Sequence, residues 1–323
     1  MAQVDELPLT SPQSNDRLLD APKRLKVPSL VLLLIIGALL AVTAVFAKAA
    51  PTVGWHPLTL LLWSLCGASV LRSAGLYLHR EPVPDDKHKP RYWGFSRHLV
   101  TYQLVSGLLF VAPSAIAFAA APHVGAGFVT LTYAFPLVLT YVLSLIIGLE
   151  RLDVMRMSGV LFGLAGGALF ALNAGSVNPQ ISNWILGAIS LPVLLALGNV
   201  YRTLRWPANA SPEVLSVGMM AVGFGFLLAF APAMGVPILP DNFSFSAVGL
   251  LIAQILLFTV QYALFFQLQR QAGPVYLSQI GCVSAAIGLP LAFTFFHEIP
   301  SQIQLGALVL VVIGIVMVNK RTT

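Results

Sequence analysis

Ten apolar segments alternate with short polar segments along almost the whole chain. Each apolar segment is long enough, or nearly so, to cross the hydrocarbon core of a bilayer, which takes about 20 helical residues. A segment inside lipid must pair its own backbone N–H and C=O groups, so each is expected to be an α-helix. The sequence therefore predicts an all-α membrane protein with ten transmembrane helices. They lie at about residues 29–50, 57–78, 99–121, 123–149, 156–173, 184–204, 213–234, 246–268, 274–296 and 302–318.

Composition supports the bilayer as the solvent of this chain. Of its 323 residues, 57% are hydrophobic and only 9% are charged, whereas soluble domains carry about 25% charged residues. The mean hydropathy is +0.84. Because so few charges cannot cover a soluble globule, the lipid bilayer is the first expected partner. The net charge of +6 is then an indicator of membrane orientation rather than of nucleic-acid binding.

The apolar pattern repeats. A glutamate follows the fourth segment in IIGLERLDVMRM, and another follows the ninth in FFHEIPSQIQL; these residues, Glu150 and Glu298, are 148 positions apart. A glycine and a further apolar segment follow each of them. The chain therefore divides into two five-helix repeats, residues 29–173 and residues 184–319. Because five is odd, the second repeat must enter the membrane inverted, an arrangement common among transporters.

Basic residues predict the orientation of these segments. If the N-terminus is cytoplasmic, every Lys and Arg except Lys48 lies in a cytoplasmic segment or at a helix end that faces one, as the positive-inside rule requires. The polar residues 1–28 are then a disordered cytoplasmic tail, and both termini are cytoplasmic. The expected location is the plasma (inner) membrane of a bacterium. The outer loops that contain no Lys or Arg are residues 51–56, 174–183, 231–245 and 297–301.

Several polar side chains lie within the apolar segments. A single interhelical hydrogen bond would explain any one of them, but their spread over several helices favours a polar central cavity that binds substrate. Gln254 and Gln261 are seven positions apart, so they share one helix face about 10 Å apart. The candidate substrate-binding residues of this kind are Tyr102, Gln103, Tyr133, Asn199, Gln254, Gln261 and Gln279.

Lys48 is a further candidate because it breaks the inward bias of the basic residues. It lies near the outer end of the first helix. Its ammonium group could reach the outer headgroups. Alternatively, it could face the helix bundle and meet a carboxylate or phosphate of the substrate.

No cofactor or metal site is expected. Cys66 and Cys282 both lie in apolar segments, and their spacing indicates neither a metal site nor a disulfide framework. No acidic residue lies in the middle of a segment, although proton-coupled transporters often use an embedded carboxylate. The pattern therefore favours facilitated export or exchange. An intramembrane enzyme would need a nucleophile and base or paired acids, which the segments do not provide, so no enzymatic activity is expected.

The repeated motifs resemble a known family. GLERL followed by MSGVLFGLAGGALFALN is similar to the EamA-type repeat of the drug/metabolite transporter superfamily, and FFHEIPSQIQLGALVLVVIGIVMVN resembles its second copy. AVFAKAAPTVGWHP resembles the end of the first helix of that family, including the lysine. The chain departs from the family at Trp63, where an arginine is frequent, and at Ser284, which takes the place that corresponds to Pro136. The resemblance implies a ten-helix exporter or exchanger of small metabolites that works by alternating access.

The function expected from the sequence is export or exchange of small organic metabolites, amino acids or related compounds foremost. Two other functions stay open. A sugar-phosphate or nucleotide-sugar exchanger would favour several inward-facing cations, and a non-transporting membrane partner or sensor would bind without flux. The sequence also leaves a homodimer possible.

Overall fold

The computed structural model describes residues 27–78, 97–175, 179–208, 210–299 and 301–319. Helices make up 85% of the structure, and the described residues contain no strand. Nearly all of the predicted tail, residues 1–28, lies outside the described residues. The helices, in chain order, are α1 (Ser29–Ala49), η2 (Ala50–Val53), α2 (Pro57–Leu78), α3 (Arg97–Val124), α4 (Ala126–Thr132), α5 (Pro136–Ile146), α6 (Val154–Gly175), α7 (Pro179–Leu204), α8 (Pro212–Phe230), η3 (Pro232–Met234), α9 (Phe245–Ser278), α10 (Ile280–Phe296) and α11 (Gln302–Asn319).

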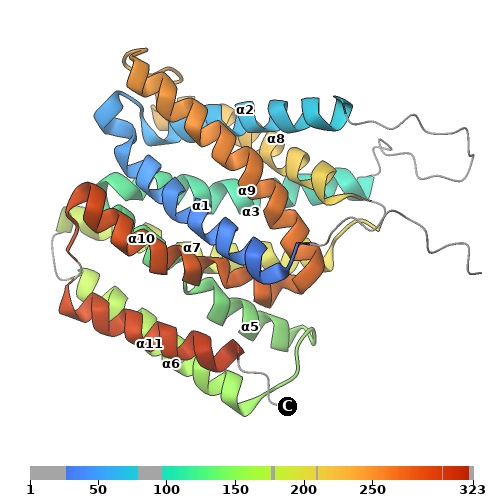
Figure 1. Ribbon diagram of the computed structural model, residues 1–323, viewed down its shortest axis with the longest axis vertical. Helices are drawn as coiled ribbons and strands as arrows, with labels where there is room; N and C mark the ends of the chain where they lie inside the picture. Colours follow the sequence, from blue (N-terminus) through green and yellow to red (C-terminus); the bar gives the residue numbers. More distant parts are fainter. Residues whose placement is uncertain (1–26, 79–96, 176–178, 209, 300, 320–323) are drawn as a thin grey trace, which may run out of the picture.

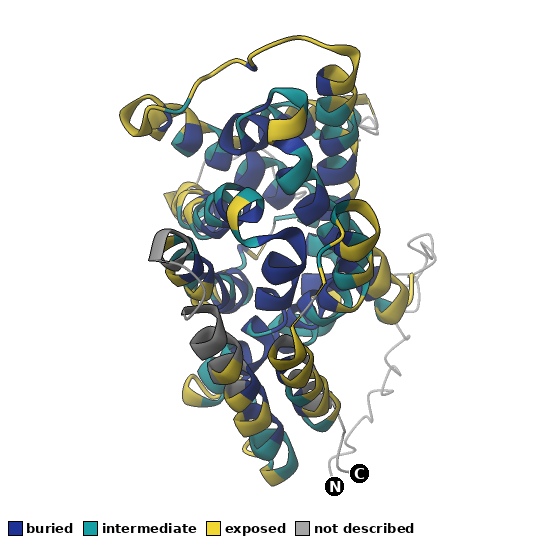
Figure 2. Ribbon diagram, turned by 90° about the vertical axis from the view of Figure 1, so that its left-hand side faces the viewer, coloured by how far each residue is buried: buried dark blue, intermediate teal, exposed yellow. Residues whose placement is uncertain are grey.

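Many of the helices are long and apolar enough to cross a membrane. Seven spans in the described residues meet this criterion, and α4 and α5 together form one of them. Three further apolar helices are shorter: Val154–Gly163, Ile280–Phe296 and Leu305–Gly314. Large apolar side chains such as Leu30, Val70 and Val309 are 57–61% exposed, and the exposed positions lie around the outside of the bundle (Figure 2). Water would disfavour such a surface and lipid would not, so the chain is a multipass membrane protein.

The helices pack as an elongated bundle (Figure 1). In its main body α1 packs against α9 and α10, α2 against α8 and α9, and α3 against α7 and α8. The pair α6 and α11 lies at one end of the long axis of the molecule (Figure 1). Segments far apart in the sequence therefore form most of the core.

The fourth apolar segment differs from the single helix expected over residues 123–149. It contains two helices, α4 and α5, with a turn at Tyr133–Phe135 between them. Pro136 is the first residue of α5 and has no N–H to continue the hydrogen-bond ladder from α4. A second interruption lies later in the chain, where Gln279 separates α9 from α10. Gly273, with φ of 77°, also breaks the helical geometry of α9.

Glycines allow α6 and α11 to approach closely. A Cβ atom at Gly314 of α11 would lie 2.9 Å from the backbone nitrogen of Gly163 in α6. Small residues of this kind let two backbones pack together inside a membrane. The glycines of α6 and α11 therefore account for the close contact between these two helices.

Candidate functional site

Two interruptions of the helical backbone meet inside the bundle. The turn at Tyr133–Phe135 lies against the beginning of α10, because a Cβ atom at Gly281 would overlap the carbonyl oxygen of Tyr133. Only glycine leaves room for this approach. Interrupted helices expose backbone groups that a continuous helix would satisfy internally, and they are tolerated in membranes where they line a cavity.

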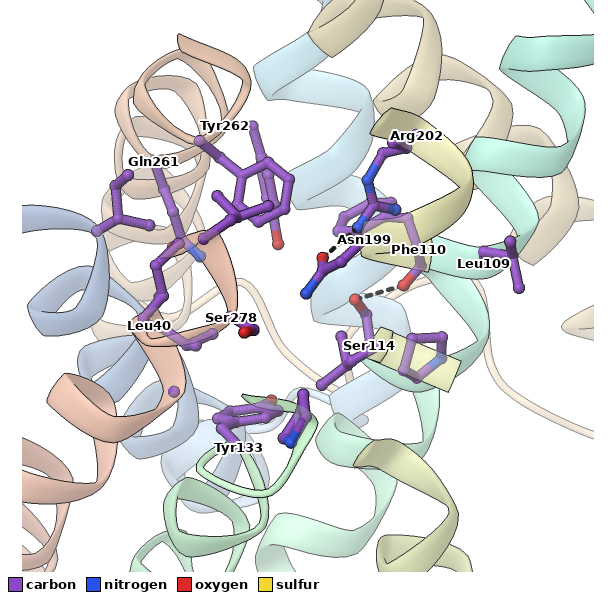
Figure 3. Close-up of a pocket in the computed structure, with 18 of the residues that line it drawn as sticks. Leu40, Leu109, Phe110, Ser114, Tyr133, Asn199, Arg202, Gln261, Tyr262 and Ser278 are labelled. Carbon is purple, nitrogen blue, oxygen red and sulfur yellow. Dashed lines mark hydrogen bonds between the residues drawn. The ribbon is translucent and has the colours of Figure 1, made fainter. Parts of the chain in front are cut away.

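A central cavity of about 80 Å³ lies beside this contact. Residues of α1, α3, α7, α8, α9, α10 and the α4–α5 turn line it, and Figure 3 shows their side chains converging from several sides. Most of the wall is apolar or aromatic, with Phe110 and Phe265 among its rings. The polar side chains that line the cavity are Ser114, Tyr133, Asn199, Arg202, Gln261, Tyr262 and Ser278.

Arg202 brings a cation to this cavity. Its residue is only 3% exposed, and its Nη2 donates a hydrogen bond to Asn199 Oδ1 at 2.9 Å. Its guanidinium carbon lies 5.3 Å from the centre of the Phe265 ring, which suits a cation–π contact. Within the described part of the chain, Nε and Nη1 have no hydrogen-bond partner. The site therefore holds a buried cation with free donors.

Neighbouring side chains fix the end of α7 that carries Arg202. Gln269 of α9 donates hydrogen bonds from Nε2 to the backbone oxygen of Asn199 and to Thr203 Oγ1, both at 3.1 Å. Tyr102 Oη lies 3.5 Å from the backbone oxygen of Arg202, and its ring stacks on Tyr201 with centres 5.9 Å apart. These contacts brace α7 against α3 and α9.

Three of the residues expected at a substrate site line the central cavity: Tyr133, Asn199 and Gln261. Gln261 Oε1 also accepts a hydrogen bond from Thr43 Oγ1 at 3.3 Å. Tyr102 is not part of the lining and contacts the end of α7 that carries Arg202.

The remaining expected residues lie elsewhere. Gln103 Nε2 is 3.4 Å from the backbone oxygen of Val214, and Gln279 occupies the break between α9 and α10. Gln254 is fully buried, and its side-chain oxygen and nitrogen have no hydrogen-bond partner among the described residues. The shared helix face of Gln254 and Gln261 therefore does not put both side chains on the wall of one cavity.

Lys48 lies at a second cavity of about 300 Å³, which Glu298 and His123 also line. Lys48 Nζ forms an ion pair with Glu298 Oε1 and lies 4.6 Å from the centre of the Phe296 ring. The same carboxylate accepts hydrogen bonds from the backbone N–H groups of Ala126 at 3.0 Å and Gly127 at 2.9 Å. One carboxylate thus joins the end of α1, the beginning of α4 and the link between α10 and α11.

Sequence reasoning missed Arg202 and the partner of Lys48. Arg202 was counted with the basic residues at cytoplasmic helix ends, and only the fold shows that its side chain turns into the bundle. The sequence shows Glu298 only as a marker of the repeat, whereas in the structure it caps α4, more than 170 positions away. No local pattern encodes these long-range contacts. Among the described residues, no group of three or more His, Cys, Asp or Glu could hold a metal ion.

Comparison with known proteins finds a family model that matches the first part of the chain. The model of the EamA-like transporter family matches residues 28–172, which confirms the EamA-type resemblance predicted from the sequence. Members of this family are membrane transporters of small molecules and not enzymes. A solved structure described only as the crystal structure of a protein aligns with 90% of this chain and 96% of its own, with a TM-score of 0.60 and 18% identity. That likeness concerns the fold alone. No curated protein matches the chain.

Proposed function

We propose that the protein carries small organic metabolites across a membrane by alternating access around the central cavity. The observation that carries this proposal is the place of that cavity, where two helix interruptions meet and polar side chains gather inside an apolar bundle. Interrupted helices at the bilayer midplane form the substrate sites of many transporters. The family match independently supports transport of a small molecule.

The two interruptions also support an arrangement of ten spans in two inverted repeats. When Glu150 is aligned with Glu298, Tyr133 corresponds to Gly281, because both pairs are 148 positions apart. Tyr133 and Gly281 touch in the structure. Equivalent positions of two repeats come into contact where a two-fold axis passes between them. A substrate at this contact would face both repeats, as alternating access requires.

Charge supports an orientation with both termini in the cytoplasm of the cell. If the predicted spans cross the membrane in chain order, Arg151, Arg156 and Arg205 fall on the same side as the N-terminus of α1. The basic excess then faces the cytoplasm, and the Lys48 cavity faces outward. The plasma membrane of a bacterium remains the location we propose.

The wall of the central cavity favours one class of metabolite over another. Arg202 is the cation among its lining residues. A sugar-phosphate or nucleotide-sugar exchanger would be expected to present several cations to its substrate. The single cation suits amino acids and related small organic compounds better.

Flux through purified protein in liposomes separates a carrier from a membrane partner or sensor. Liposomes with the protein, loaded with amino acids or organic acids, should release or exchange some of these compounds faster than protein-free liposomes. A parallel thermal-shift screen would identify the compounds that bind. Binding without flux would indicate a sensor, and the absence of both over a broad set of metabolites would contradict the proposed function.

A further inference from the structure

We infer that Arg202 binds the carboxylate of the transported substrate, so that the protein selects small organic carboxylates. This inference rests on the proposed function, because it assigns a substrate class to the same central cavity. It starts from the side chain of Arg202, which is buried without an acidic partner and has N–H groups without acceptors among the described residues. The alternative is a structural role, since a cation in the last turn of a helix is favoured by the carbonyl groups there.

The first step is the burial of Arg202 without an acidic partner. The residue is 3% exposed, and no Asp or Glu belongs to the lining of the cavity or to an ion pair with Arg202 in the described ranges. A buried charge is costly unless an opposite charge and hydrogen bonds compensate it. An anionic ligand would supply both.

The second step is the hydrogen-bonding capacity that remains. A guanidinium has five N–H donors in a rigid plane. Asn199 Oδ1 accepts from Nη2, while Nε and Nη1 are free of partners in the part of the chain described here. A carboxylate can accept two parallel hydrogen bonds from such a group. Nε–H and the Nη1 hydrogens point to different edges of the guanidinium, so a carboxylate would accept from one of these free donors, or from one of them together with the second hydrogen of Nη2.

The third step is that the surroundings hold the guanidinium in place. Asn199 accepts its hydrogen bond on one side, and the Phe265 ring lies 5.3 Å away on another. A Cβ atom at Gly198 would lie 2.9 Å from Nη1, so the glycine leaves the space that this nitrogen occupies. Gln269 braces the same turn of α7. A preorganised donor loses little conformational entropy when a ligand binds.

The fourth step concerns the rest of the ligand. Beside Arg202 the cavity offers neutral hydroxyl and amide groups and apolar or aromatic walls, as Figure 3 shows for Tyr133, Gln261 and Tyr262. A monocarboxylate with a small apolar or aromatic body would balance the single positive charge. A phosphate dianion would bring one negative charge in excess, and an amine without a carboxylate would add a second cation next to Arg202. The chemistry of the wall thus favours one carboxylate.

Matched acids and amides test this selection directly. The probes are phenylacetate with phenylacetamide, and isovalerate with isovaleramide, titrated into the purified full-length protein by calorimetry. The members of each pair have nearly the same shape and differ in charge. Wild-type protein should bind at least one acid about tenfold or more tightly than its amide, the range expected for a charge-assisted pair of hydrogen bonds. Equal binding of acid and amide, or binding of neither acid, would overturn the inference.

Variants assign the selection to one side chain. Arg202→Gln should remove the preference for the acid, and Arg202→Lys should restore part of it, because an ammonium retains the charge but lacks the planar fork. Arg205→Gln is the matched control, since Arg205 is exposed, lies three positions away and is not part of the cavity wall. If Arg202→Gln does not fold, Arg202→Lys and the wild-type selectivity still decide the question. Retained acid preference in a folded Arg202→Gln protein would assign Arg202 a structural role.

Failure of this inference can be told apart from failure of the proposed function. Liposome flux of neutral or cationic metabolites with no preference for acids would contradict the role of Arg202 and leave transport standing. If the protein binds the acids in calorimetry but no compound tested crosses the liposome membrane, transport would be contradicted and the carboxylate-binding site would be supported.

Discussion

At the scale of single residues, Lys48 forms an ion pair with Glu298, a residue 250 positions away. The pair joins the end of α1 to the link between α10 and α11. The charge pattern of the sequence shows the unusual position of Lys48 on the outer side but not its distant partner. Arg202 presents the opposite problem: it follows the positive-inside pattern and so attracts no notice, although its side chain is buried. Charge patterns indicate the side of the membrane but not the direction in which a long side chain turns.

The ion pair leads to a prediction that separates a role of Lys48 in stability from a role in substrate binding. Both side chains are 21% exposed, so each should stabilise the charge of the other. Lys48→Met and Glu298→Gln should each lower the free energy of unfolding by about 1–3 kcal/mol, the range for hydrogen bonds to charged groups. The double variant should lose clearly less than the sum, because both substitutions remove one interaction. Thermal unfolding in detergent would measure the three values.

A direct role of Lys48 in substrate binding would give a different result. The half-saturation concentration for flux would then rise in Lys48→Met and not in Glu298→Gln. Additive losses of stability in the double variant would contradict the coupling that the ion pair implies.

Gln261 and Gln254 provide a matched test of the cavity wall. Both are buried in α9, but only Gln261 lines the central cavity. Gln261→Leu should raise the half-saturation concentration for flux roughly fivefold, equivalent to one neutral hydrogen bond of about 1 kcal/mol. Gln254→Leu should leave it unchanged and maintain or raise stability, because leucine replaces an amide without described partners. Equal effects of the two substitutions on flux would argue that neither side chain meets the substrate.

At the scale of elements, the apolar segments of the sequence predict where helices occur but not where those helices are interrupted. The expected helix over residues 123–149 contains the turn at Tyr133–Phe135. Pro136 follows this turn, yet proline alone does not signal a break, since Pro113 lies inside the continuous helix α3 and Pro290 inside α10. What distinguishes the turn is its contact with Gly281. The break depends on tertiary packing, which a local pattern does not contain.

The close contact of α6 and α11 can be tested with two alanines on one helix. A methyl group at Gly314 would lie 2.9 Å from the backbone nitrogen of Gly163, whereas nothing lies within 4 Å of one at Gly306. Gly314→Ala should therefore lower the free energy of unfolding by about 1–3 kcal/mol through overpacking. Gly306→Ala should be neutral or raise it by about 0.5–1 kcal/mol, because alanine favours the helix. Similar melting temperatures for the two variants in detergent would show that the helices do not pack this closely.

His56, in the link before α2, should make the stability of the protein depend on pH. Burial lowers the pKa of His56 from its ordinary value of 6.5, and Asp241 opposes this shift. Its Nδ1 accepts the N–H of Leu58 at 3.3 Å, which requires the neutral ring. Below about pH 6.5 the unfolded chain therefore binds a proton that the folded protein resists. His56 should contribute a loss of stability as pH falls from 6.5 toward its folded pKa.

The variant His56→Gln isolates this contribution. Its amide oxygen can accept a hydrogen bond but does not titrate in this range. The difference in melting temperature between wild type and variant should thus change between pH 7 and pH 5. A constant difference across this range would contradict a lowered pKa for His56.

At the scale of the whole molecule, the orientation proposed from charge makes opposite predictions for two exposed loops. Leu239 follows η3 in a loop predicted to lie outside the cell, and Ala208 follows α7 in a loop predicted to be cytoplasmic. Both residues are exposed. Both residues belong to the part of the chain that the structure describes. With Cys66 and Cys282 replaced by alanine, Leu239→Cys should react with an impermeant maleimide in intact cells. Ala208→Cys should react only after the membrane is opened, because the basic residues near it hold that end in the cytoplasm.

The comparison of the two loops also tests the inverted repeat, since five spans between equivalent positions must place Glu150 and Glu298 on opposite sides of the membrane. A cysteine at Thr52 should then behave like Leu239→Cys, as both belong to the end that carries the Lys48 cavity. Labelling of Ala208→Cys in intact cells would reverse the orientation, and labelling of both loops from the same side would remove the inverted repeat altogether.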